Sequence, residues 1–156
     1  MNTTSKRCTC RVDFLNSNEA AHYRLIELSY DATLSHLHEA IYQSFGLPEG
    51  AFAIFHQSNE KGELGQAIPL TSMEPDGFSA EDYRIQDLLT AQHPYLAYIW
   101  DPLRNLQFFI QLQSVLVSNE REGVWVIQEV GPAIDVAQYT PPIGLDPEDE
   151  ELLKGL

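Results

Sequence analysis

The stretch TLSHLHEAIYQSFGLP, from Thr33 to Pro48, decides the fold of this chain. Its apolar side chains recur at the spacing of one face of an α-helix: Leu34, Leu37, Ile41 and Phe45. Asp31 or Thr33 can cap the first turn by accepting hydrogen bonds from free backbone amides. Gly46 suits the left-handed residue just after the last turn, and Pro48 blocks continuation. The sequence therefore predicts one amphipathic helix with its own start and stop.

Two segments of alternating polarity precede this helix. Residues 9–15 and 23–30 each alternate with the period of a strand, and residues 16–21 between them are rich in turn formers. The simplest pairing is an antiparallel hairpin. The apolar side of the two strands consists of Cys10, Val12, Phe14, Ile26, Leu28 and Tyr30. We expect Arg24 and Glu27 on the opposite side of the second strand.

Further elements follow the helix. Short strands are predicted at residues 51–56 and 68–70, the latter as an edge strand, and a helical turn at residues 83–89. The last third contains strands at residues 95–100, 106–117 and 123–130. The first of these is apolar on both sides, as in a central strand. We expect the last to pair back on the strand before it.

This order predicts an α+β domain, a mostly antiparallel sheet with one long helix packed across it after the N-terminal hairpin. A hairpin followed by such a helix resembles the order of a ubiquitin-like β-grasp. A chain of 156 residues is large enough for one hydrophobic core, and we assign residues 1–135 to this single domain. Residues 136–156 form an acidic, proline-containing tail that we expect to be mobile. Its acids are Asp146, Glu148, Asp149, Glu150 and Glu151.

Charge limits the partners of this chain. Nine basic and 23 acidic residues give a formal net charge of −14. Nucleic-acid phosphates and anionic membrane surfaces attract positive proteins, so direct binding to either is disfavoured. The acids can serve solubility alone, or they can form a face that meets a basic partner. The sequence leaves both interpretations open.

Membrane and secretory signals are missing from the sequence. No stretch approaches the roughly 20 apolar residues that a membrane-spanning helix needs. The first seven residues lead into a strand without the apolar region of a secretory signal. We therefore expect a cytoplasmic protein.

Residues that carry chemistry are sparse. Cys8 and Cys10 are the only cysteines, and two ligands do not close a tetrahedral zinc site, so we expect a reduced pair in a strand. His36 and His38 lie about 200° apart around the predicted helix, so they cannot chelate one ion together. No phosphate-binding loop or nucleophile elbow occurs. The sequence predicts no metal ion, no cofactor and no catalytic residue.

One polar cluster is a candidate binding site. Asp101, Arg104 and Asn105 lie in the turn that follows the buried strand at residues 95–100. Functional groups often occupy loops positioned by a rigid element. The alternative is a turn stabilised by local hydrogen bonds.

The helix motif and a later strand motif carry a family resemblance. Thr33-Leu34-x-x-Leu37-His38-Glu39-Ala40-Ile41, followed by Phe45-Gly46, resembles the helix signature of the plasmid pRiA4b open-reading-frame-three-like family. Tyr98-Ile99-Trp100-Asp101 and then Phe108-x-Ile110-x-Leu112 resemble its second block. Members are often named insertion-element passenger proteins. Phe108-Phe109-Ile110 and residues 130–133 are similar to an acidic, Bacteroidetes-type subgroup.

The chain departs from that family in ways that bear on chemistry. Many members continue the aromatic-Asp pair with Gly-Asp-x-Trp-x-His, whereas residues 103–108 here are Leu-Arg-Asn-Leu-Gln-Phe. The acid and the histidine of that pattern are absent. The resemblance implies no established activity, and it implies no metal or acid–base site for this chain.

These observations predict a non-enzymatic, cytosolic domain that acts through protein–protein contacts with an unidentified, basic partner. One alternative is an acidic protein that occupies a basic nucleic-acid-binding surface as a charge mimic. Another is a small hydrolase or ligand-binding protein whose site is assembled from distant residues.

Overall fold

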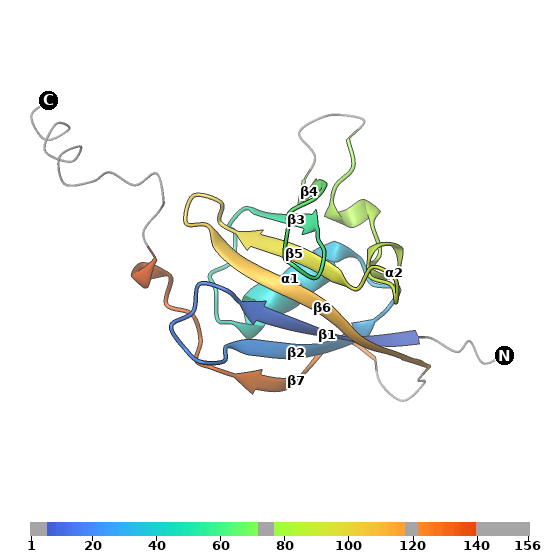
Figure 1. Cartoon of the computed structure of the whole chain (residues 1–156), viewed down its shortest axis with the longest axis horizontal. Coiled ribbons are helices and arrows are strands. Elements are labelled where there is room, and N and C mark those ends of the chain that lie inside the picture. The colour runs from blue at the N-terminus through green and yellow to red at the C-terminus, as the bar shows by residue number, and fades with distance from the viewer. Residues whose placement is uncertain (1–5, 72–76, 118–121, 140–156) are drawn as a thin grey trace, which may run out of the picture.

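The computed structural model describes residues 6–71, 77–117 and 122–139, which form one seven-stranded sheet with the order β4-β3-β5-β6-β1-β2-β7 (Figure 1). The strands are β1 (Lys6–Phe14), β2 (Tyr23–Ser29), β3 (Ala53–Gln57), β4 (Ala67–Pro69), β5 (Tyr95–Trp100), β6 (Leu106–Val117) and β7 (Trp125–Val130). The helices are α1 (Leu34–Ser44) and the short η1 (Ala80–Asp82), α2 (Ile85–Leu88) and η2 (Val136–Gln138). The mostly antiparallel sheet with few helices agrees with the predicted class.

The helix α1 begins and ends where its sequence signals predict. Thr33 is the N-cap, and its hydroxyl accepts from the backbone N–H of His36 at 3.4 Å. At the other end Gly46 adopts a left-handed φ of 73°, and a Cβ there would lie 2.8 Å from the Cβ of Ala133. Glycine is therefore required at this position both by backbone conformation and by space.

The core joins α1 to the strands. Leu34, Leu37, Ala40 and Ile41 are the buried residues of α1, and they belong to one cluster with the inward side chains of β1, β2, β5 and β6. The ring centroids of Phe45, just after α1, and Phe108 of β6 lie 5.0 Å apart. The alternation predicted for β1 and β6 is confirmed by burial of Cys10, Val12, Phe14, Leu106, Phe108 and Ile110.

The pairing of the last strand differs from the prediction. Residues 123–130 were expected to pair with 106–117, but β7 pairs with β2, with Ile26 opposite Val126 and Arg24 opposite Glu129. The expectation is wrong because β6 already has β5 on one side and β1 on the other. All six pairings of the described strands are antiparallel. A β-grasp sheet has a parallel pair of strands at its centre, so that comparison applies only to the order of hairpin and helix.

Arg24 lies on the buried side of β2, where its position two residues before Ile26 places it. The expectation that it faces away from the apolar side is wrong, since only 2% of the residue is exposed. Its Nε donates to the Ser44 carbonyl at 2.9 Å. Its Nη1 donates to the carbonyls of Tyr23 and Val130, both at 2.9 Å. The guanidinium carbon lies 4.5 Å from the centre of the Phe45 ring. The buried cation thus joins the end of α1 to the end of β7.

His22 holds the segment that follows β7. Its Nε2 lies 2.7 Å from the Pro132 carbonyl and its Nδ1 lies 2.6 Å from the Ser17 hydroxyl. Gly131 has a φ of 91°, and a Cβ there would lie 2.5 Å from the His22 ring. Any other residue at this position would push the chain off the imidazole.

The chain packs on the core as far as Tyr139. Ile134 is buried and its N–H donates to the Phe45 carbonyl at 2.8 Å. The ring of Tyr139 meets that of Phe14 edge to face, with centroids 5.5 Å apart. Residues 136–139 of the predicted tail therefore contact the core, and its remainder, 140–156, lies outside the described residues.

Replacing Leu37 by alanine should lower the free energy of unfolding by about 2–5 kcal/mol, because the truncation leaves a cavity in the core. Gln43→Ala is the matched control, since Gln43 is exposed on the same helix and should change stability by less than about 0.5 kcal/mol. Urea unfolding followed by circular dichroism measures both. Equal effects of the two substitutions would contradict the assigned buried face.

Candidate functional site

The turn that contains the predicted binding residues is a fixed connection between β5 and β6. Asp101 and Asn105 have positive φ values of 49° and 56°, and they are the non-glycine residues with positive φ in the described part of the chain. Arg104 Nε lies 3.4 Å from Asp101 Oδ2. The structure thus brings the three predicted residues together in one turn. The charges of Asp101 and Arg104, however, are paired with each other.

Neighbouring loops hold the same turn from both sides. The side-chain amide of Asn16 donates to the Asn105 carbonyl at 3.2 Å and its Oδ1 accepts from Gln107 N at 2.8 Å. Asp101 N donates to the Phe52 carbonyl at 2.7 Å. These bonds stabilise the left-handed residues of the turn. The geometry favours the structural interpretation of this cluster.

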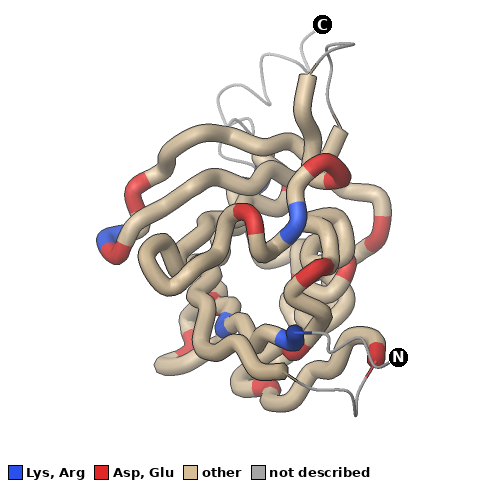
Figure 2. Tube along the Cα trace, turned by 90° about the vertical axis from the view of Figure 1, so that its right-hand side faces the viewer, with Lys and Arg blue, Asp and Glu red and all other residues tan. Residues whose placement is uncertain are grey.

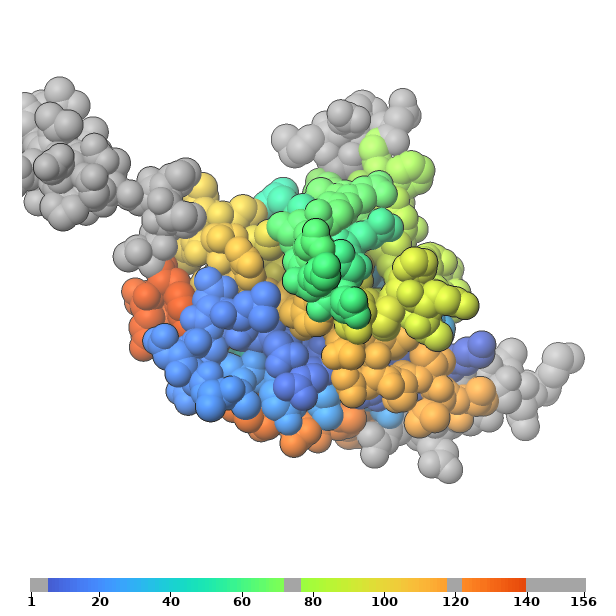
Figure 3. All heavy atoms as spheres, in the orientation of Figure 1, coloured from blue at the N-terminus to red at the C-terminus, as the bar shows by residue number. Residues whose placement is uncertain are grey.

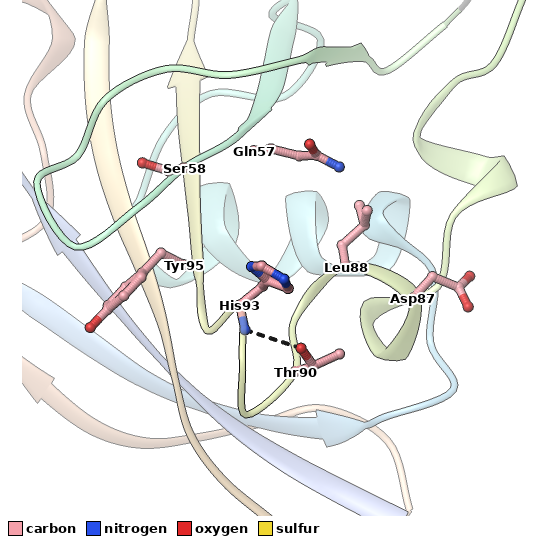
Figure 4. A pocket seen from close by; sticks show the side chains of 7 residues that line it. All are labelled: Gln57, Ser58, Asp87, Leu88, Thr90, His93 and Tyr95. Carbon is pink, nitrogen blue, oxygen red and sulfur yellow. Dashed lines mark hydrogen bonds between the residues drawn. The ribbon is translucent and has the colours of Figure 1, made fainter.

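A cavity of about 250 Å³ opens elsewhere, between the ends of β3 and β5 and the helix α2 (Figure 4). Its lining residues are Gln57, Ser58, Asp87, Leu88, Thr90, His93 and Tyr95. No spacing in the sequence links these residues, because pairing of β3 with β5 brings them together. None of these seven residues is a site residue predicted from the sequence.

The cavity lining includes a serine, a histidine and an aspartate, which are the residue types of a hydrolase triad, but they are not arranged as a triad. The Ser58 hydroxyl donates to the Glu63 carbonyl at 2.9 Å, and Asp87 Oδ2 accepts from Arg84 N at 2.9 Å. Figure 4 places Ser58 and Asp87 on opposite sides of His93. A triad needs the serine on the base and the base on the acid. The observed contacts supply neither link.

His38 and Tyr98 form a polar pair between α1 and β5. His38 Nδ1 lies 2.6 Å from the Tyr98 hydroxyl. Burial lowers the pKa of His38 to about 4 and raises the pKa of Tyr98 well above its usual range. Tyr98 therefore stays protonated, and its hydroxyl donates a hydrogen bond to the neutral imidazole of His38. Neither residue lines the cavity in Figure 4, so we assign the pair a structural role.

Among the described residues, the longest run of exposed apolar side chains starts one residue before β7 and continues into this strand. Val124, Trp125, Val126 and Ile127 are each 40–49% exposed. β7 ends the sheet, along the lower border of the molecule in Figure 3, and a register shift opposite Leu25 and Ile26 leaves Ile127 as the extra residue of a bulge. Bulges are common at sheet edges and beside functional sites. In a sequence, a run of four apolar residues without alternation is typical of a strand that is covered on both faces.

The ends of β7 are anchored by buried arginines. Arg7, which is 4% exposed, donates to the Gly123 carbonyl at 2.6 Å and pairs with Glu27 at 3.2 Å. Arg24 holds the Val130 carbonyl at the other end. The exposed residues therefore belong to a strand that is fixed at both ends.

Charges and metal-ligating residues show no comparable grouping. Figure 2 shows aspartate and glutamate dispersed over loops on several sides of the described chain. Cys8 and Cys10 are buried free thiols. Within residues 6–71, 77–117 and 122–139, no group of three or more His, Cys, Asp or Glu residues could hold a metal ion. No helix in these ranges is long and apolar enough to cross a membrane.

The fold defines the class of protein to which this chain belongs, an α+β domain built on one wholly antiparallel sheet. A structure of this class is a protein of unknown function, MM3350, from Methanosarcina mazei Go1, with a TM-score of 0.71 and 18% identity. The match covers 85% of this chain and 73% of that one, and it concerns the fold alone. The chain belongs to the plasmid pRiA4b ORF-3-like protein family, whose model matches residues 7–136. None of the curated proteins matches the sequence.

The His38–Tyr98 pair predicts a pH dependence of stability. Because the pKa of His38 is lowered from 6.5 to about 4 in the folded state, the unfolded chain binds more protons between these values. Stability should therefore fall as the pH decreases from 6.5 towards 4, with a His38 contribution of at most about 3 kcal/mol, because the ring is partly exposed and solvent screens its charge. His38→Gln keeps an acceptor for Tyr98 but does not titrate. Urea unfolding at several pH values should give a shallower fall for the variant, and identical slopes would refute this assignment.

Proposed function

We propose that this chain is a non-enzymatic domain that acts through protein–protein contacts, by binding an extended segment of a basic partner along the outer edge of β7. The observation that carries the proposal is the exposed run from Val124 to Ile127, which begins one residue before β7 and continues along this terminal strand of the sheet. Natural edge strands are usually short, charged or covered, because their free N–H and C=O groups can pair with another chain. An apolar edge strand is suited to strand addition.

The exposed side chains give such an edge an anchor. Trp125 is 49% exposed, and tryptophan is among the residues that contribute most to protein interfaces. Its Nε1 donates to the Glu122 carbonyl at 2.9 Å, which orients the indole on the surface. Anchoring by Arg7 and Arg24 fixes the strand before a partner arrives, so little conformational entropy is lost on binding.

The charge of the chain favours a basic partner. The net charge is −14, and the carboxylate of Glu129 on β7 is 59% exposed although it lies 4.0 Å from Arg24. A partner strand that alternates apolar residues with lysine or arginine would place its apolar side chains against Trp125 and its cations near Glu129. A second copy of this chain would bring two charges of −14 together.

The two alternatives have weaker support. A charge mimic of nucleic acid needs acids gathered on one face, and the described acids are dispersed (Figure 2). A hydrolase needs a serine or another nucleophile within reach of a base, and the described contacts of Ser58 and Asp87 lead elsewhere. These two observations favour the contact function over a charge mimic and over a hydrolase.

The proposal can be tested by the fluorescence of Trp125. In a Trp100→Phe background Trp125 is the only tryptophan, because the chain has two. A short synthetic peptide in which valine alternates with lysine should shift this fluorescence saturably. Binding should weaken from about 0.1 M to about 1 M salt, where the screening length falls from about 10 Å to about 3 Å. A peptide with glutamate in place of lysine should not bind.

Two variants localise the contact. Ile127→Lys should abolish binding of the Val-Lys peptide because it places a cation in the apolar run. Leu103→Lys is the matched control, since Leu103 is also exposed, at 56%, but lies in the turn between β5 and β6. Failure of the lysine peptide to bind, equal binding of both peptides, or equal loss in both variants would contradict the proposal.

A further inference from the structure

A second cavity, of about 100 Å³, opens where the loop after β1 meets the segment after β7 (Figure 1). Ser17 of the loop is partly exposed in its lining, and His22, at the end of the same loop, is buried beside it. The described lining residues are Ser17, Asn18, Glu19, His22, Pro132, Ala133, Ile134, Asp135, Gln138 and Tyr139. A small molecule can therefore reach a serine that lies against a shielded imidazole.

The tautomer of His22 follows from its two hydrogen-bond partners. The Pro132 carbonyl can only accept a hydrogen bond, so Nε2, which lies 2.7 Å from it, carries the ring hydrogen. Nδ1 of the neutral ring is then an acceptor, and the Ser17 hydroxyl, 2.6 Å away, donates its hydrogen to it. The carbonyl thus fixes the tautomer in which the imidazole is a base towards Ser17.

Ser17 has the surroundings of an activated nucleophile. Its hydrogen is directed at a base, and a third group orients that base, which is the arrangement that activates serine for acyl transfer. The N–H of Glu19 donates to Ser17 Oγ at 3.0 Å, which holds the oxygen and leaves it a second lone pair. Ser58 differs, because its hydroxyl donates to a backbone carbonyl.

The lining also limits what this serine can do. Acyl transfer with turnover needs N–H donors directed at the oxygen on which negative charge develops. Four lining residues have N–H groups that are already bonded within the chain, namely Glu19, Ile134, Gln138 and Tyr139. These groups therefore give no help with an unactivated ester or with hydrolysis of an acyl-serine. The site favours a single uptake from an activated donor.

Size and charge select the acyl group and its donor. A volume of about 100 Å³ is that of about three water molecules in the liquid, which suits an acetyl group. Glu19 and Asp135 belong to the ten described lining residues, and neither lysine nor arginine is among them. These acids and the net charge of −14 repel anionic donors such as acyl phosphates. An uncharged activated ester or thioester meets both conditions.

We infer that Ser17 is a covalent acetylation site that takes an acetyl group from a small, uncharged, activated ester, with His22 as the base. Ser17 Oγ forms the bond to the acyl carbon while its proton moves to His22 Nδ1. The bond from the acyl carbon to the oxygen or sulfur of the donor breaks, and the proton on Nδ1 passes to that leaving group. The chain keeps one acetyl group without turnover, which is compatible with the non-enzymatic function proposed above.

The inference does not depend on the contact at β7, because none of the residues from Val124 to Ile127 lines this cavity. p-Nitrophenyl acetate tests it on the full chain. The natural chain should release one equivalent of nitrophenolate in a burst and carry one acetyl group on Ser17, located by mass spectrometry of the tryptic peptide 12–24. General-base help should make Ser17 react at least about a hundredfold faster than the other serines. Ser17→Ala should remove both the burst and the modification.

Ser29→Ala is the matched control. Ser29 is also partly exposed, and its Oγ accepts from the N–H two residues later, that of Asp31, at 3.2 Å. Among the described residues no hydrogen bond joins Ser29 to a histidine. This variant should keep the burst of the natural chain.

The role of the base needs its own measurements. His22→Gln, with its fold checked by circular dichroism, should slow acetylation of Ser17 about a hundredfold, because glutamine cannot take up the proton. Heavy water should slow the reaction of the natural chain, since a proton moves in the same step. An unchanged burst in Ser17→Ala, loss of the burst in Ser29→Ala, or an equal rate in heavy water would overturn the inference. Release that continues at the burst rate beyond one equivalent would contradict the single uptake.

Discussion

The buried guanidinium of Arg24 is the interaction on which the arrangement of the C-terminal third depends. It donates to carbonyls of Tyr23, Ser44, Val130 and Pro132, with distances of 2.9–3.3 Å. Taking a cation out of water is costly unless its hydrogen bonds are satisfied, and four carbonyls together with the Phe45 ring meet this demand. Ser44 ends α1, where the exposed carbonyls of a helix favour a cation. The arginine thus joins segments that are also held by the pairing of β2 with β7, by the contact of His22 with the Pro132 carbonyl and by the bond from Ile134 N to the Phe45 carbonyl.

Arg7 plays the corresponding part at the start of β7. Its bond to the Gly123 carbonyl and its pair with Glu27 fix the entry of the strand, as Arg24 fixes its exit. The middle of β7 can then expose Trp125 and its apolar neighbours without loss of strand geometry. Residues that hold the strand are therefore distinct from those that a partner would contact, which allows the surface to be altered separately from the fold.

Much of the fold follows from local signals, and the remainder depends on competition between distant segments. The helix caps, the alternation of β1 and β6 and the short edge strand β4 could be predicted because each depends on nearby residues. The partner of β7 could not, since it is decided by which strand edges remain free after β5 and β1 flank β6. The burial of Arg24 could be predicted, because residues two apart in a strand face the same side and Ile26 is buried. Its carbonyl partners could not, because they come from three separate segments.

The candidate sites illustrate the same division. The turn at Asp101 was predictable as a turn because Pro, Asp and Asn in a short connection favour left-handed and hydrogen-bonded residues. The cavity beside α2 was not, because its lining is gathered from residues 57–95 by the pairing of β3 and β5. The exposed run on β7 had a sequence signal in its four successive apolar residues, but exposure depends on the strand's place at the end of the sheet.

Unfolding of an Arg24→Lys variant tests the central role of the buried guanidinium most directly. Lysine keeps the charge but cannot reach four carbonyls in the planar geometry of arginine. The variant should lose about 3–5 kcal/mol of stability, and the amides of β7 and residues 131–134 should exchange hydrogen faster than those of β5. Arg11→Lys, at an arginine whose side chain is 37% exposed and paired with Asp13, should cost less than about 1 kcal/mol. Equal losses in the two variants, with unchanged exchange in β7, would contradict the account.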